Sequence, residues 1–87
     1  MNDESLLQFP CDFSIKVIGG GDPGFQTLVM ERVRRYAPDL DEARVQVRDS
    51  RAGRYQAVTV TIHARDRAQL DAIYRDLSAH PHIKMAL

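Results

Sequence analysis

The chain has 87 residues, with 12 Lys and Arg against 12 Asp and Glu and a single cysteine. This length holds one hydrophobic core, so we expect one domain over residues 9–87 after a flexible tail over residues 1–8. The zero net charge argues against a protein that binds mainly by neutralising nucleic-acid phosphates or anionic lipid. The lone Cys11 excludes an intrachain disulfide and a zinc ribbon. Because the sequence shows neither a signal peptide nor a membrane-length apolar stretch, we expect a cytoplasmic protein that makes no membrane contact.

Residues 12–18 predict a first strand, because apolar and polar residues alternate there with the period of a half-buried strand. The run Gly19-Gly20-Gly21 is expected to end it. Asp22-Pro23 predicts the start of a helix, since an aspartate side chain can cap free N–H groups and proline fits the first helical turn. Apolar residues at helical spacing extend this helix to about Ala37.

The rest of the chain continues in the same way. It predicts a strand over 44–48, a turn over 49–54, a strand over 55–64, a helix over 66–79 and a closing strand over 82–87. Asp66 and Gln69 have the spacing of a capping box at the start of the second helix. In the closing strand, Ile83, Met85 and Leu87 are the alternate residues expected to face the core.

The element order β-α-β-β-α-β predicts an α+β fold, a ferredoxin-like sandwich. Right-handed crossovers would place both helices on one face of a four-stranded antiparallel sheet. Each predicted strand has one apolar set of alternate residues, suited to face the helices, and one mostly polar set left for the other side. We call that other side of the sheet the open face.

The open face is where the sequence gathers positive charge. The alternate residues predicted to lie on it are Ser14, Lys16, Ile18, Arg44, Gln46, Arg48, Tyr55, Ala57, Thr59, Thr61, His63, His82, Lys84 and Ala86. This set holds four Lys and Arg, two His and no carboxylate, although the whole chain is neutral. Such a surface favours an anionic ligand or an acidic partner, and the alternative is that the charges only keep edge strands soluble. The candidate binding residues are Lys16, Arg44, Arg48, Tyr55, Thr59, Thr61, His63 and Lys84.

Three other patterns favour structural explanations. The glycine run lacks the ending of a Walker loop, which predicts a turn rather than a phosphate site. His63, His80 and His82 have no cysteine or nearby carboxylate to complete a metal site, so we expect no metal and no cofactor. Gly53-x-Tyr55 is similar to a segment of the RNA-recognition motif, but no second exposed aromatic residue follows, so RNA binding is only a distant alternative.

No nucleophile lies beside a base in any known catalytic spacing, and we therefore expect a protein that is not an enzyme. Like charges on the open face oppose face-to-face pairing, which predicts a monomer or a weak homodimer joined at strand edges or helices. On the helices, Glu31 with Arg35 and Asp71 with Arg75 have the spacing of surface ion pairs.

Several segments, taken together in order and spacing, carry a family resemblance. They are Phe9-Pro10, Phe13-x-x-Lys16-Val17-Ile18-Gly19, Ala37-Pro38, Ser50-x-x-Gly53-x-Tyr55-x-x-Val58-x-Val60-Thr61-Ile62, Tyr74-x-x-Leu77 and Ile83-x-Met85-x-Leu87. From Phe9 onward the chain resembles the YbeD-like family of small bacterial proteins. The resemblance implies a ferredoxin-like fold similar to the ACT regulatory domains of amino-acid-metabolism enzymes, and a role as a lipoic-acid-binding regulatory protein.

The resemblance brings no catalytic motif, and of the singled-out residues Lys16, Gly53 and Tyr55 fall on its pattern. We therefore expect a non-enzymatic regulatory or adaptor domain. Its open face, centred on Lys16, Thr59 and Thr61, would receive a small carboxylate such as lipoate or octanoate, or an acidic or lipoylated protein partner. The alternative is an ACT-like amino-acid-sensing dimer, with its ligand near the turn between the first strand and the first helix.

Overall fold

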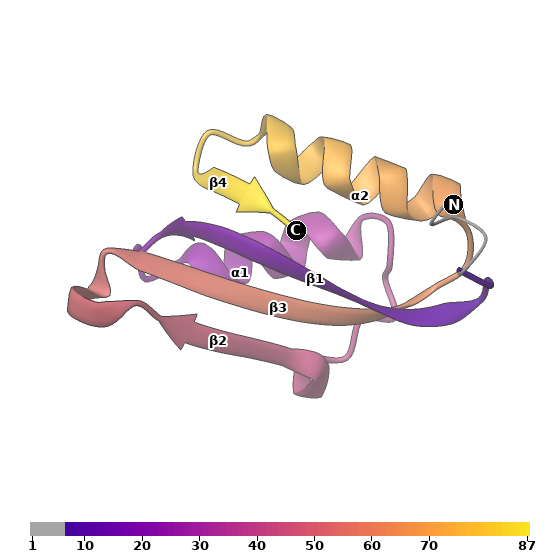
Figure 1. The fold of residues 1–87 in the computed structure, drawn as a ribbon, viewed down its shortest axis with the longest axis horizontal. Coiled ribbons are helices and arrows are strands. Elements are labelled where there is room, and N and C mark those ends of the chain that lie inside the picture. Colours follow the sequence, from indigo (N-terminus) through magenta and orange to yellow (C-terminus); the bar gives the residue numbers. More distant parts are fainter. Residues whose placement is uncertain (1–6) are drawn as a thin grey trace.

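The computed structural model describes residues 7–87, so most of the predicted tail lies outside the described residues. Its strands and helices are β1 (Cys11–Gly20), α1 (Phe25–Arg34), β2 (Val45–Asp49), β3 (Tyr55–Ala64), α2 (Arg67–Ala79) and β4 (Ile83–Ala86), with short 3-10 turns at Glu42–Arg44 and Arg51–Gly53. The strands form one sheet in the order β2-β3-β1-β4 with every neighbouring pair antiparallel (Figure 1). This order confirms the predicted ferredoxin-like arrangement.

β1 runs two residues further than the alternation predicted. Gly19 and Gly20 pair with Gln56 and Tyr55 of β3, so two of the three glycines belong to the sheet and not to a loop. Gly19 has a packing role, because a β-carbon there would overlap the ring of Phe25. Gly21 lies beyond the strand, where a β-carbon would overlap the carbonyl oxygen of Gly53. The turn before α1 therefore touches the turn between β2 and β3, backbone against backbone.

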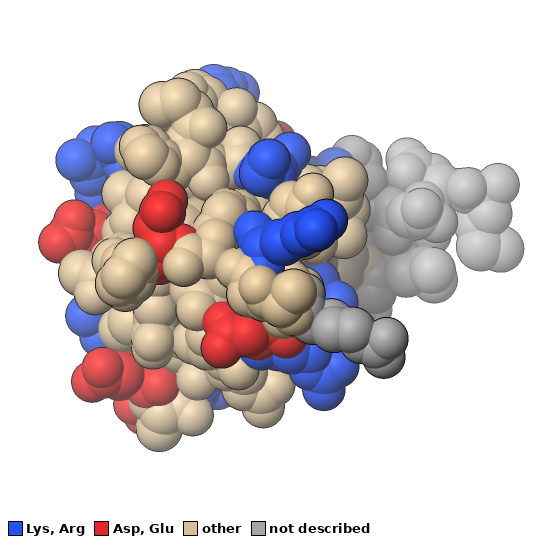
Figure 2. Space-filling model, turned by 90° about the vertical axis from the view of Figure 1, so that its left-hand side faces the viewer, with Lys and Arg blue, Asp and Glu red and all other residues tan. Residues whose placement is uncertain are grey.

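These two turns lie at the end of the molecule that Figure 2 shows. Basic and acidic side chains are interspersed on that end, without a field of one sign. Neither sign of charge therefore dominates this end of the molecule.

α1 begins and ends differently from the prediction. Its N-cap is Gly24, and Asp22 contributes its backbone carbonyl, which accepts from Phe25 N (3.1 Å), so the predicted side-chain cap is wrong. The helix ends at Arg34. Beyond it the chain tightens, since the N–H groups of Tyr36 and Ala37 both donate to Val33 O. Ala37 precedes a proline, a position that disfavours helical backbone, and this shortens the helix.

α2 begins at the predicted cap. Asp66 Oδ1 accepts from Gln69 N at 2.8 Å. The side chain of Gln69 does not close the capping box but is buried, with Oε1 accepting from Arg65 N (2.7 Å) and Nε2 donating to Tyr36 O (2.8 Å). One buried amide therefore ties the chain after α1 to the chain before α2, and both of its polar ends are satisfied.

β4 contains a bulge that reverses the predicted alternation. Gly19 pairs with Ile83 and the preceding Ile18 pairs with Met85, so β4 advances two residues where β1 advances one. An extra residue turns every later side chain to the opposite face. Met85 and Leu87 are accordingly 51% and 59% exposed, while Ala86 packs against the core. The prediction that Met85 and Leu87 face the core and Ala86 faces outward is wrong.

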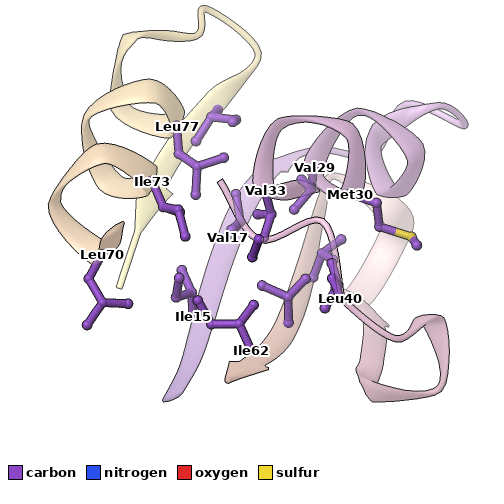
Figure 3. Close-up of a cluster of buried hydrophobic side chains, with 14 of the residues drawn as sticks. Ile15, Val17, Val29, Met30, Val33, Leu40, Ile62, Leu70, Ile73 and Leu77 are labelled. Carbon is purple, nitrogen blue, oxygen red and sulfur yellow. The ribbon is translucent and has the colours of Figure 1, made fainter. Parts of the chain in front are cut away.

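The core lies between the sheet and the two helices, which cover one face. Figure 3 shows Val29 and Val33 from α1 and Ile73 and Leu77 from α2 pointing toward β1 and β3. The alternate residues of the two central strands that were predicted to face the helices are buried: Ile15, Val17, Val58, Val60, Ile62 and Ala64. Among residues 7–87, neither helix combines the length and the apolar character needed to cross a membrane.

Candidate functional site

The open face carries side chains in rows that run across the strands. Lys16 of β1 lies opposite Thr59 of β3, which lies opposite Gln46 of β2. The next row is formed by Ile18, Ala57 and Arg48. These pairings confirm the predicted alternation in β1, β3 and β2.

A hollow of about 310 Å³ lies where these two rows meet, and its lining comprises Lys16, Gln46, Val47, Arg48, Ala57 and Thr59. Lys16 and Arg48 are both exposed. Neither forms an ion pair with any carboxylate among residues 7–87. Two positive charges without an ion-pair partner among residues 7–87 therefore border a hollow that is also lined by Thr59.

Asp12 corrects the predicted charge of the open face. It lies opposite His63 in the β1–β3 pairing, so the face is not free of carboxylates. Arg44 Nη2 donates to Asp12 Oδ2 (2.8 Å), and His63 Nδ1 lies 3.2 Å from Asp12 Oδ1. The hydrogen bond from Arg44, followed by that from His63, holds the pKa of Asp12 below its usual value, and Asp12 in turn raises the pKa of Arg44. Arg44 and His63 are thus already engaged.

Arg44 also lies outside β2. It is the last residue of the 3-10 turn that precedes the strand, and not the first strand residue. Asp12 was within reach of sequence reasoning, because it continues the alternation of Ser14 and Lys16 by one step toward the N-terminus. Ser14 Oγ and Thr61 Oγ1, which lie between the Asp12 pair and the hollow, are 2.8 Å apart and hydrogen-bond to each other.

Tyr55 and Lys84 meet at the other end of the open face. Lys84 Nζ lies 5.4 Å from the centre of the Tyr55 ring, at cation–π distance. β1 lies between their strands, and the residue opposite Tyr55 there is Gly20, which has no side chain to separate them. The eight candidate residues therefore divide into four groups along the face, with Thr61 bonded to Ser14 between the Asp12 pair and the hollow, and only Lys16, Arg48 and Thr59 border the hollow.

Two predicted members of the open face lie elsewhere. Ala86 is turned to the core by the bulge, as described above. His82 precedes β4, and its Nδ1 lies 3.7 Å from Asp22 Oδ2. A second hollow, of about 520 Å³, lies there, lined by Asp22, Gly24, Phe25, Leu28, His80 and His82. Within residues 7–87 no three His, Cys, Asp or Glu side chains converge as metal ligands would.

Comparison with known proteins places the chain in a family. The family model described as "Protein of unknown function (DUF493)" matches residues 4–87. The UPF0250 protein NE1487 of Nitrosomonas europaea is 46% identical over 87 residues and the whole of both chains, and a UPF0250 protein of Paraburkholderia phymatum is 48% identical over 85 residues, 98% of this chain and 96% of its own. The chain belongs to the DUF493 family.

This membership confirms the YbeD-like resemblance. The fold is also found in a solved structure. The solution structure of protein HP0495 from H. pylori has a TM-score of 0.71 to this chain at 15% identity, covering 100% of this chain and 94% of that one. At so low an identity the likeness concerns the fold alone, and it agrees with the four-stranded sheet and two helices of this DUF493 protein.

Proposed function

We propose that this DUF493 domain is a non-enzymatic regulatory or adaptor protein that binds a small carboxylate on its open face. The observation that carries the proposal is the pair Lys16 and Arg48, which border a hollow of about 310 Å³ without a counter-ion among residues 7–87. Hydrogen bonds to ionised partners are shorter and stronger than neutral ones. A carboxylate between the two cations would accept such bonds from both.

The rest of the hollow suits the same ligand. Gln46 and Thr59 supply neutral hydrogen-bond donors on the row that contains Lys16. The lining includes no histidine, cysteine or carboxylate, the groups that most often transfer protons or attack substrates. These two features support binding rather than catalysis.

An apolar strip beside the hollow favours a ligand with an aliphatic chain. Ile18 is half-buried in the row of Arg48, and the bulge in β4 turns Met85 opposite it onto the same face. Leu87 exchanges two backbone hydrogen bonds with Lys16, at 3.0 and 2.8 Å, and its side chain is exposed. Lipoate and octanoate, which the YbeD-like resemblance implies, combine a carboxylate with such a chain.

We test the proposal by titrating ¹⁵N-labelled protein with lipoate and octanoate and following amide shifts. The shifts are expected to move at Lys16, Arg48 and Thr59 at millimolar ligand. Lys16→Gln or Arg48→Gln removes one charge-assisted hydrogen bond and is expected to weaken binding by about tenfold. Arg54→Gln, in the β2–β3 turn, is the matched control and is expected to leave the affinity unchanged. Unchanged shifts in β1 and β3 at millimolar ligand would exclude the small-carboxylate function.

A second candidate is the ACT-like sensor of amino acids, and the hollow at the β1–α1 turn favours it. That hollow of about 520 Å³ places the carboxylate of Asp22 beside the apolar side chains of Phe25 and Leu28. An amino acid could present its ammonium group to Asp22. This candidate requires a dimer, so sedimentation with and without amino acids distinguishes it from the first.

The proposed setting is the bacterial cytoplasm. All the relatives described above are bacterial proteins, and Cys11 is a free, half-buried thiol, which suits a reducing compartment. RNA binding receives less support than carboxylate binding. Lys84 lies over the ring of Tyr55, the surface on which a base would stack.

A further inference from the structure

The side of the molecule opposite the open face carries a groove between the two helices. One hollow of about 550 Å³ lies along the C-terminal half of α2, with Arg32 and Tyr36 on one side and Arg75 and Asp76 on the other. A second of about 520 Å³ lies at the start of α2, between Arg35 and Arg65. Tyr36 lines both hollows, so they adjoin one another at this residue. We call the two together the helix groove.

The acidic side chains of the helix groove already have partners. Asp76 accepts from Tyr36 Oη (2.8 Å) and from Arg32 Nη1 (3.4 Å), and its side chain is 11% exposed. The hydrogen bond to Asp76, followed by desolvation, raises the pKa of Tyr36, so its hydroxyl stays protonated as a donor. Asp66 accepts from Gln69 N as the cap of α2. Asp76 therefore already has an arginine partner, while Asp66 forms no ion pair with any arginine among residues 7–87.

Two arginines of the groove lack the partners that the sequence predicted. Asp71 pairs with Arg67 (3.3 Å) and not with Arg75. The expected pair of Glu31 with Arg35 does not form either, and within residues 7–87 neither Arg35 nor Arg75 contacts any carboxylate. Both side chains are exposed. Each hollow is lined by two arginines and one carboxylate, Arg32, Arg75 and Asp76 in the first and Arg35, Arg65 and Asp66 in the second, so each has one positive charge in excess.

The helix groove is as long as α2, and small side chains form part of its wall. Its α2 wall follows the whole helix, Arg67–Ala79, and at about 1.5 Å per residue this is about 20 Å. About six residues of extended chain span that length. Ala68 and Ala72 line the wall with small side chains that let a backbone approach the helix.

We infer that the helix groove binds an acidic, extended segment of a partner protein. Charge complementarity selects an anion, because Arg35 and Arg75 are unneutralised in separate hollows. A single small anion in one hollow would pair with only one of Arg35 and Arg75. Carboxylates spaced along a peptide can pair with both arginines. A nucleic acid is less well matched, since the two rings that line the groove, Tyr36 and His80, are half-buried and base stacking needs exposed rings.

The test uses fluorescein-labelled hexaglutamate as the probe and hexaglutamine as the neutral control, with anisotropy as the readout. The hexaglutamate is expected to bind and to lose affinity as salt rises. The double variant Arg35→Gln, Arg75→Gln is expected to bind about tenfold more weakly. The matched control is Arg34→Gln, Arg54→Gln, which removes the same number of exposed charges outside both the groove and the hollow of the open face and is expected to bind as the unaltered protein does.

Three results would overturn the inference. The first is no binding of hexaglutamate at low salt, and the second is an equal loss in both double variants, which would mean that only total charge matters. The third is binding of hexauridylate, but not hexaglutamate, through Arg35 and Arg75, which would make the groove a nucleic-acid surface. Failure of the lipoate titration leaves these results unaffected, because the two sites share no residue. Circular dichroism of each variant confirms that it remains folded.

Discussion

Asp12 is the residue that decides how much of the positive charge on the open face is free. It engages Arg44 and His63, and so leaves Lys16 and Arg48 as the exposed cations beside the hollow. Because Arg44 and His63 lower the pKa of Asp12 below 3.8 in the folded protein, its contribution to stability is present above that pH. The contribution is lost as the pH falls through the lowered pKa, where the carboxylate becomes protonated.

Replacing Asp12 by Asn tests this at the residue scale. The variant is expected to unfold at lower urea concentration than the parent protein at pH 6, where Asp12 is ionised. The gap between the two midpoints is expected to shrink as the pH is lowered below about 3.8. A gap of the same size at pH 6 and at pH 2.5 would show that the Asp12 contacts do not stabilise the fold through its charge.

At the scale of elements, the bulge in β4 places Ile83 and Met85 on opposite faces of the sheet. Ile83 is 8% exposed and Met85 is 51% exposed, although strict alternation would place both in the core. Ile83→Lys would bury a charge and is expected to cost about 3 kcal/mol or more. Met85→Lys adds a charge to an exposed position and is expected to change stability by less than about 0.5 kcal/mol. Urea unfolding of the two variants measures the difference, and equal costs would contradict the bulge.

The same element shows where sequence reasoning succeeds and where it stops. The long alternation of β3 predicted its bounds correctly, and Asp66 caps α2 as its spacing predicted. The bulge has no such signal, because a register shift depends on how β4 meets Ile18 and Gly19 of a strand far away in the chain. Ion pairs are also ambiguous, since Asp71 has an arginine four residues away on either side and the structure selects Arg67.

The sequence also predicted only part of the candidate site. Alternation placed Lys16, Arg48 and Thr59 on one face, and the register brings them around one hollow. It could not show that Asp12 would engage Arg44, which lies in a turn and reaches Asp12 across the width of β3. A periodic pattern describes which way a strand residue points but not which side chain it meets.

At the scale of the whole molecule, the neutral chain has cations without an ion-pair partner on two opposite sides. Lys16 and Arg48 lie on the open face, while Arg35 and Arg75 lie along the helix groove. Cations on both sides oppose the stacking of one copy on another through either like surface. We therefore expect a monomer, or a weak dimer joined at strand edges.

Sedimentation velocity at low and high salt measures this. Screening reduces repulsion between like charges, so the fraction of protein in any dimer is expected to increase as the salt concentration rises. The same runs with added amino acids test the sensor candidate, which requires ligand-bound dimers. A tight dimer that is indifferent to salt would contradict the proposed role of these charges.

The contact between Gly21 and Gly53 has a consequence for how the chain tolerates change. One glycine belongs to the first half of the chain and the other to the second, and the approach is between backbones, with no side chain that could rotate away. A side chain at Gly21 therefore displaces the β2–β3 turn, whereas a β-carbon at Gly53 would meet nothing within 4 Å. A residue with a side chain, or a label, introduced at Gly21 therefore acts on both turns, although it is made in the first half of the chain.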